Sequence, residues 1–234
     1  MTEAEWLECE EPDPMLEFLS DKASECQLRL TICACYRQWW VHKSLLPPDP
    51  LTQLLREAVD HVERSRGALP PDHVRYALRD EIRDRSHSSV LHLEQWELKH
   101  LGIYILMANE TINGTIFELR ICRDLAAKSA TRRRDGAAYD AAAKAELPEQ
   151  AAIIRDIFGN PFRPLGFAPS WRTDTAVALA RQIYDTRDFS AMPILADALQ
   201  DAGCDSDDTL GHLRDPHATH ARGCWALDLV LGKE

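Results

Sequence analysis

Residues 22–42, with the sequence KASECQLRLTICACYRQWWVH, decide the fold of this 234-residue chain. Their apolar side chains recur every three or four positions, which is the period of one face of an α-helix. A β-strand buried on one side would instead alternate apolar and polar residues. The stretch therefore predicts a long helix that ends before a cluster of prolines. The residues that carry the pattern are Cys26, Leu28, Leu30, Ile32, Cys33, Cys35, Trp39 and Trp40.

The same spacing recurs along the rest of the chain, and no segment alternates over a useful length. Local signals mark helix boundaries, such as Asp49 and Pro70 before two apolar runs and Gly203 after a later one. The periodic segments predict an all-α protein of roughly nine to eleven helices, either a bundle or an irregular stack of helix pairs, with no substantial sheet. The other segments are 15–19, 51–62, 74–82, 90–106, 112–125, 174–184, 190–199 and 224–231.

The expected organisation is a single helical domain over residues 1–234 with one candidate sub-boundary. Residues 126–152 are rich in alanine and contain three consecutive arginines, a glycine and a proline, so they could form a boundary or a mobile connection. Alanine equally favours a solvent-facing helix, and both interpretations stay open. Residues 153–234 are expected to form a helical cap over an irregular loop at 158–164, because two prolines interrupt regular structure there.

Composition and charge indicate which kinds of molecule this protein is expected to bind. The chain is 45% hydrophobic with a formal net charge of -11, a globular composition without the cationic surface that nucleic acid requires. The first residues lack the features of a signal peptide, and no apolar run is long enough to span a membrane. Seven cysteines are an odd number and are better explained as reduced thiols than as disulfides. We therefore expect a cytoplasmic protein whose partner is another protein.

The densest group of metal-ligand residues lies near the C-terminus, at Cys204, His212, His217, His220 and Cys224. Zinc is bound tetrahedrally by thiolate and imidazole groups, and iron also accepts imidazole ligands. Cys204, Cys224 and two of the histidines could therefore hold zinc or iron, although the spacing lacks the short pairs of standard zinc signatures. The alternative is that both cysteines are buried apolar groups and the histidines cap helices or face solvent. Nearby aspartates that could orient the imidazoles are Asp205, Asp207 and Asp208.

Two further patterns are weaker. Glu97 and His100 are spaced as in carboxylate-bridged di-iron bundles, but there is no second copy, and a polar helix face is the simpler interpretation. Cys33 and Cys35 cannot form an ordinary disulfide within a helix and lack the two-residue spacing of a redox motif. Core packing is the prediction for both cysteines.

The candidate partner-binding residues are Trp6 and the basic run Arg132, Arg133 and Arg134. Trp6 is expected to be exposed near the start of the chain, where it either packs the N-terminus down or contacts a partner. The three arginines could meet phosphate, nucleic acid or an acidic partner, although such a run more often forms a solvated helix face.

Two regions of the chain resemble a bacterial protein family of unknown function. The first carries TEAEWL at 2–7 and PMLEFL at 14–19, and the second carries RDIFGNPFRP at 155–164, MPILADAL at 192–199 and HARGCW at 220–225. The resemblance covers about half the chain and implies no activity, cofactor or partner. The family pattern has a cysteine where this chain has Leu213, and His217 is peculiar to this chain. The positions that it singles out are Cys204, His212, His220 and Cys224.

No glycine-rich phosphate loop, nucleophile elbow or Ser/His/Asp arrangement is recognisable. Because many helices could present a groove, the sequence favours a non-enzymatic module that binds another protein through a helical surface and needs no cofactor. The alternative function is metal binding by the C-terminal cluster, in a structural or weakly catalytic role.

Overall fold

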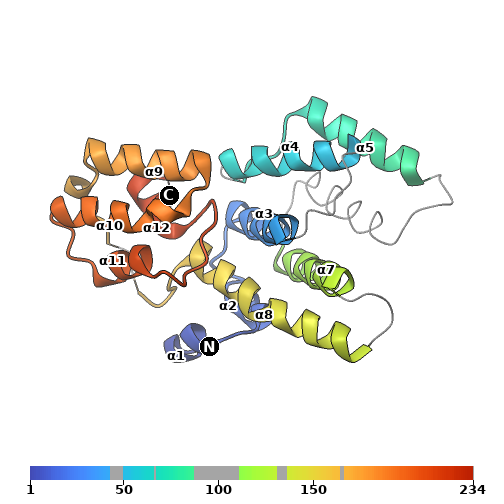
Figure 1. The fold of residues 1–234 in the computed structure, drawn as a ribbon, viewed down its shortest axis with the longest axis horizontal. Coiled ribbons are helices and arrows are strands. Elements are labelled where there is room, and N and C mark those ends of the chain that lie inside the picture. Colours follow the sequence, from blue (N-terminus) through green and yellow to red (C-terminus); the bar gives the residue numbers. More distant parts are fainter. Residues whose placement is uncertain (43–49, 66, 87–110, 131–135, 164–165, 234) are drawn as a thin grey trace. The chain divides into compact units, whose positions relative to one another are not determined.

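The computed structural model describes residues 1–42, 50–65, 67–86, 111–130, 136–163 and 166–233. Within these ranges it contains eleven α-helices, two short 3-10 helices and no strand (Figure 1). The predicted all-α class is therefore confirmed. None of the helices in these ranges combines the length and the apolar character that crossing a membrane requires.

The chain forms two compact units. The terminal unit comprises Met1–Cys9 and Ala152–Glu234, and the central unit comprises Glu10–Ala151. The helices of the central unit are α2 (Pro12–Phe18), α3 (Glu25–His42), α4 (Pro50–Arg64), α5 (Asp72–Ser86), α7 (Ile112–Ala130) and the first part of α8 (Gly136–Phe158). Those of the terminal unit are α1 (Glu3–Glu8), the end of α8, α9 (Asp174–Thr186), α10 (Met192–Asp201), α11 (Asp207–Arg214) and α12 (Trp225–Leu231), with 3-10 turns at Pro169–Trp171 and Phe189–Ala191.

The alanine-rich stretch at 126–152 is helical wherever the structure describes it. Its first residues end α7, and residues 136–152 lie in α8. The described parts of this stretch are therefore helical, as one of the two interpretations proposed. The division between the units falls within α8, after residue 151.

The helix predicted at 22–42 is present as α3 but begins at Glu25. Ser24 and Gln27 explain the difference because they form a capping box. The Gln27 backbone N–H donates to Ser24 Oγ at 3.2 Å, and the Ser24 backbone N–H donates to Gln27 Oε1 at 3.1 Å. Such reciprocal bonds satisfy the first amides of a helix and fix where it starts. The helix predicted at 90–106 and the cap at Asp49 lie outside the described residues.

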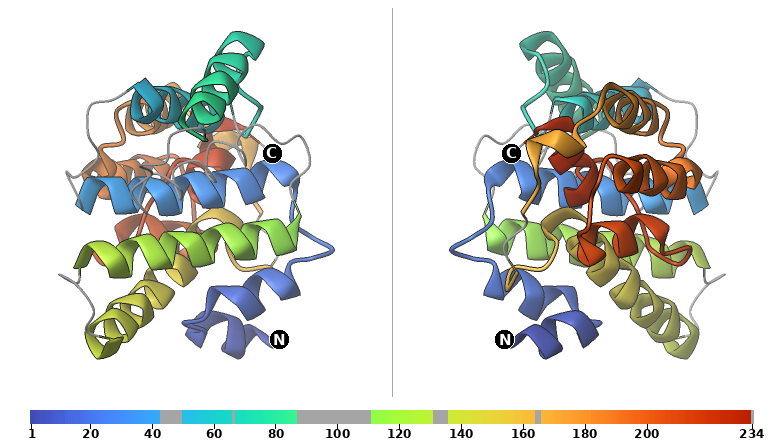
Figure 2. Two further views of the ribbon diagram at one scale, coloured as in Figure 1. Left: turned by 90° about the vertical axis from the view of Figure 1, so that its right-hand side faces the viewer. Right: turned by 90° about the vertical axis from the view of Figure 1, so that its left-hand side faces the viewer.

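In the central unit, α3 and α7 run side by side (Figure 2). Between them the Tyr36 hydroxyl donates a 3.0 Å hydrogen bond to Glu118 Oε2, and both residues are buried. Cys33 and Cys35 are buried as well, so their predicted core position is confirmed. Burial raises the pKa of the Cys35 thiol far above its usual value, which is typical of a packing residue rather than a reactive one.

The terminal unit has its own core. Its last four helices lie together in Figure 1, where α10 packs on α9 and α11, and α12 packs on α9. Their apolar faces bury a continuous cluster, and burial of this kind is the main favourable contribution to folding. The cluster is formed by Ala176, Ala180, Ile183, Met192, Leu195, Ala196, Leu199, Cys204, Leu210, Leu213, Cys224, Ala226, Leu227 and Val230.

The N-terminal helix α1 belongs to the terminal unit. A capping box between Thr2 and Glu5 starts it. At its other end, Arg155 Nη1 donates to the carbonyl oxygens of Trp6 (3.3 Å) and Cys9 (2.7 Å). The Trp6 side chain is 0% exposed, so the expectation that it lies on the surface is wrong. An indole gains more from burial than almost any other side chain, and here it packs the N-terminus down.

Two other arginines of the terminal unit bind the carbonyl ends of helices in the same way. Arg172 Nε donates to the Leu229 carbonyl of α12 at 3.0 Å. Arg222 donates from Nε to Tyr184 O (2.5 Å) and from Nη2 to Asp185 O (2.7 Å) in the last turn of α9. The last carbonyls of a helix have no partner within it, and a cation is also favourable at the negative end of the helix dipole.

Replacing the buried indole should destabilise the terminal unit. Trp6→Ala removes a large side chain from a packed site, for which we expect a loss of about 3–5 kcal/mol in the free energy of unfolding. The neighbouring Leu7 is 52% exposed, and Leu7→Ala should change that free energy by no more than about 0.5 kcal/mol. Urea denaturation followed by circular dichroism measures both, and equal losses would contradict the packing described for α1.

Candidate metal centre

Asp156, near the end of α8, is a carboxylate buried in the terminal unit, with 2% of its side chain exposed. Such a group is costly unless it is paired or hydrogen-bonded. Its Oδ1 lies 3.1 Å from Nε2 of His212 and 3.0 Å from Nδ1 of His220. Its Oδ2 accepts a 2.8 Å hydrogen bond from the backbone N–H of Ala221. Two imidazoles and one amide thus converge on a single acidic side chain.

Cys224 completes the group. Its Sγ lies 3.3 Å from Nε2 of His212, and the residue is fully buried. One ligand-type atom from each of Asp156, His212, His220 and Cys224 lies within 4.8 Å of the other three. The structure therefore brings together three of the residues that the sequence analysis names as ligands, with a carboxylate as the fourth.

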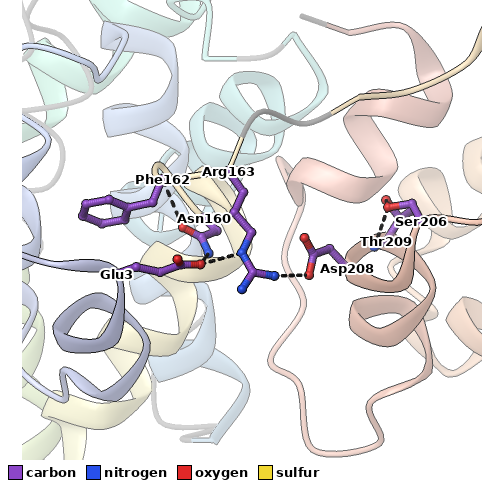
Figure 3. Close-up of polar contacts among 7 residues, drawn as sticks. All are labelled: Glu3, Asn160, Phe162, Arg163, Ser206, Asp208 and Thr209. Atoms are coloured by element: carbon purple, nitrogen blue, oxygen red, sulfur yellow. Dashed lines mark hydrogen bonds and ion pairs between the residues drawn. The ribbon is translucent and has the colours of Figure 1, made fainter.

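Three separate segments deliver these side chains. Asp156 comes from α8, and His212 comes from the last turn of α11. Ser206 caps the start of α11, where its Oγ accepts a hydrogen bond from the Thr209 N–H at 3.3 Å (Figure 3). A loop then leads back to His220, and Cys224 is the residue that precedes the first turn of α12.

Arg222 anchors the turn between His220 and Cys224. Its buried guanidinium binds the carbonyl end of α9, as described above, and lies 5.6 Å from the centre of the Tyr184 ring. Gly223 follows with a φ of 94°, a conformation that side chains other than glycine rarely adopt. Arg222 and Gly223 therefore fix the backbone between the two candidate ligands His220 and Cys224.

The charges in the group depend on one another. Burial has the largest influence on Asp156 and raises its pKa, but the hydrogen bonds and charges of His212 and His220 outweigh it, so the pKa lies below its usual value. Burial, followed by the negative charge of Asp156, raises the pKa of the Cys224 thiol well above its usual value. A divalent cation reverses that effect, because a thiol that coordinates a metal ion is deprotonated.

Three separations within the group are close to those of a tetrahedral metal site. Zinc–nitrogen and zinc–oxygen bonds of about 2.0–2.1 Å and a zinc–sulfur bond of about 2.3 Å put neighbouring ligand atoms about 3.3–3.6 Å apart at tetrahedral angles. The N···O distances of 3.0 and 3.1 Å and the N···S distance of 3.3 Å are within a few tenths of an ångström of those values. Other separations in the group extend to 4.8 Å, so the side chains would have to move closer together around an ion.

The same residue types also occur in cysteine-histidine-aspartate catalytic triads. In a triad the nucleophile and the carboxylate contact different nitrogens of the imidazole, so that a proton can pass to the ring while the carboxylate orients it. Here Cys224 Sγ and Asp156 Oδ1 both lie against Nε2 of His212. A triad would need the thiol and the carboxylate on opposite nitrogens of the ring. Because both contact the same nitrogen here, the arrangement resembles ligand atoms gathered around an ion more than a proton relay.

Cys204 is the predicted ligand that the structure does not bring into the group. It lies in the hydrophobic core of the terminal unit, where its backbone N–H donates to Leu199 O. Asp156 takes its place and was not among the ligands predicted from the sequence. A signal was present, since Ile153 and Ile157 are buried on the same face of α8. An acidic residue within such an apolar face indicates a buried carboxylate with specific partners.

The remaining candidate residues from the sequence are not members of this four-residue group. His217 is exposed, and Asp208, expected to orient an imidazole, instead accepts a 2.9 Å hydrogen bond from Arg163. The basic run and the Glu-x-x-His pair lie outside the described residues. These are Arg132, Arg133, Arg134, Glu97 and His100.

A cavity of about 280 Å³ adjoins the candidate metal centre. His212 belongs to both, and 18% of its side chain is exposed. Arg163, in the wall of the cavity, connects α1 to α11 because it binds Glu3 through Nε and Asp208 through Nη1 (Figure 3). The other lining residues are Trp6, Leu7, Arg155, Gly159, Asn160 and Trp225.

Comparison of the chain with protein-family models, with curated proteins and with solved structures found no match. The family resemblance of the N-terminal and C-terminal sequence motifs stays a prediction. A functional assignment therefore has to come from the geometry of the site.

Asp156→Asn should remove a pH-dependent part of the stability of protein treated with a chelator. Because folding lowers the pKa of Asp156, its ionised form stabilises the fold above the unfolded-state pKa of about 3.9, and this contribution is lost as the pH falls through the lower folded-state value. At neutral pH the variant should lose about 1–3 kcal/mol, since an amide cannot accept all three hydrogen bonds.

Urea denaturation across the acidic range measures this difference. The stability of the wild type should fall more steeply below a pH of about 4 than that of Asp156→Asn. Asp201→Asn, at an exposed position of α10, is the matched control and should follow the wild type. Parallel curves for the wild type and Asp156→Asn would show that this carboxylate is not held ionised by its neighbours.

Proposed function

We propose that this chain is a zinc-binding protein whose ligands are Asp156, His212, His220 and Cys224. The observation that carries the proposal is the convergence of four zinc-type ligand atoms within 4.8 Å inside the terminal unit. Support comes from the burial of the carboxylate and the thiol, which a divalent cation would compensate.

The ligand set favours zinc over iron, the other metal considered for the cluster. One thiolate, two imidazoles and one carboxylate make a complete tetrahedral shell, which is the usual geometry of zinc. Non-haem iron sites built from two histidines and a carboxylate keep positions open. Here Cys224 supplies a fourth protein ligand. A shell closed by protein side chains is typical of structural rather than catalytic zinc.

A structural ion at this position would join α8, the end of α11 and the start of α12. The charges also balance, because the carboxylate of Asp156 and the thiolate of Cys224 neutralise a divalent cation between two neutral imidazoles. Since the ligands come together only in the folded chain, the binding free energy of the ion adds to the stability of the terminal unit.

The interaction module that the sequence favours stays a prediction. Of its expected contact residues, Trp6 is buried, and the three arginines lie outside the described residues. Zinc binding does not conflict with such a role, because a helical unit fastened by an ion could still present a surface to a protein partner.

Metal analysis of protein purified without chelator tests the proposal. The wild type should carry about one zinc per chain, as a single four-ligand site requires. Cys224→Ser and His220→Ala should lose most of the metal because each removes one of the ligands. Loading with cobalt(II) adds a spectroscopic readout, since the thiolate-to-cobalt absorption of the wild type should disappear in Cys224→Ser.

Two matched variants are the controls. Cys204→Ser changes a buried cysteine outside the group, and His217→Ala changes an exposed histidine close to His220. Both should retain zinc, although the former should lower the stability of the core. A wild type free of zinc after loading and desalting would refute the proposal, and so would equal loss of zinc from Cys204→Ser and Cys224→Ser.

A further inference from the structure

The cavity beside the candidate metal centre has walls of two kinds. Trp225 contributes aromatic surface, whereas the Trp6 side chain, although it adjoins the cavity, is 0% exposed. Arg155, Asn160 and Arg163 contribute polar groups that mainly donate hydrogen bonds, and Asp208 is the carboxylate in the lining. At about 280 Å³ the cavity is near the lower end of ligand pockets, so its size suits a small molecule. Its chemistry suits an acceptor-rich ligand that has an apolar body.

Arg163 has a donor that remains available. Its side chain is 50% exposed, with Nε bound to Glu3 Oε1 at 2.5 Å and Nη1 bound to Asp208 Oδ1 at 2.9 Å. Figure 3 shows the guanidinium held between these two carboxylates. Its Nη2 has no hydrogen-bond partner among the residues that the structure describes. Two ion pairs thus fix the guanidinium while one nitrogen is left to donate.

His212 offers a second donor. Its Nε2 lies against Asp156 and Cys224, whereas its Nδ1 has no hydrogen-bond partner in the described part of the chain. With zinc on Nε2, the proton of the neutral ring must reside on Nδ1. Histidines that bind metals almost always donate this second N–H to a carboxylate, a carbonyl or water. His212 also lines the cavity, so a ligand there can supply the acceptor.

We propose that this cavity binds a small organic carboxylate with a ring or a short apolar body. The carboxylate accepts hydrogen bonds from His212 Nδ1 and Arg163 Nη2, and the body lies against Trp225. This inference rests on the proposed function, because zinc on Nε2 is what makes Nδ1 a donor. A carboxylate on Nδ1 also makes His212 a stronger ligand, so bound acid and bound zinc should each strengthen the binding of the other.

Nuclear magnetic resonance of zinc-loaded protein with ¹⁵N-labelled tryptophan tests this directly, with benzoate as the probe. The indole N–H signal of Trp225 should shift in a saturable way. That of Trp171, which lies in the same unit but does not line the cavity, should not. Benzyl alcohol, which keeps the ring and lacks the charge, should bind at least about tenfold more weakly, because hydrogen bonds to a charged group are worth about 1.5–3 kcal/mol.

Arg163→Gln should weaken benzoate binding by about tenfold for the same reason. Arg181→Gln, at an exposed position of α9 outside the cavity, is the matched control and should leave it unchanged. Benzoate should also raise the affinity for zinc in a chelator competition. The inference is overturned if zinc is bound and the Trp225 indole signal stays unshifted, if benzyl alcohol binds as well as benzoate, or if the two arginine variants bind alike.

The zinc content of the same samples separates the two proposals. If zinc-loaded protein does not bind benzoate, the proposed ligand site is contradicted and the proposed metal centre is not. If the protein binds no zinc, both proposals are contradicted.

Discussion

The buried carboxylate of Asp156 is the constraint on which the terminal unit depends. A charge removed from water has to be matched by hydrogen-bond donors or by a cation, and the groups that meet this need come from two later segments of the chain. His212 arrives at the end of α11, while His220 and the Ala221 amide arrive on the loop before α12. The positions of these segments are therefore determined together rather than one by one. A zinc ion at the same point would strengthen an arrangement that hydrogen bonds already define.

Three arginines also hold segments of the terminal unit in place. Arg155, Arg172 and Arg222 each donate to carbonyl groups near the end of a helix, where the backbone has no partner of its own. Arg222 matters most for the site, because it holds the turn that separates two candidate ligands. Arg155 lies next to Asp156 in sequence and binds α1, so adjacent residues of α8 hold the N-terminal helix and the metal-ligand group. The RDIFGNPFRP and HARGCW sequences therefore each contain at least one candidate metal ligand together with an arginine that holds a neighbouring helix end.

Much of the fold could be predicted from periodicity, since helices such as α3, α9 and α10 have apolar residues at helical spacing. Helices with few apolar residues were missed, and α1 and α11 are defined chiefly by the capping residues Thr2 and Ser206. Three of the four candidate ligands were predicted because histidine and cysteine are conspicuous near the C-terminus. Asp156 was not, because aspartate is common and only its place among buried isoleucines distinguishes it. Cys204 was predicted as a ligand because it is close in sequence to the histidines, but its side chain lies in the hydrophobic core instead.

The measurement that tests the account most directly is X-ray absorption at the zinc edge of protein loaded with one equivalent of zinc. The account predicts one sulfur neighbour at about 2.3 Å and three nitrogen or oxygen neighbours at about 2.0–2.1 Å, with the signature of imidazole scattering. Two sulfur neighbours would contradict it by bringing Cys204 into the shell in place of Asp156. A shell of oxygen atoms alone would contradict it entirely, because the metal would then be bound elsewhere on this acidic chain.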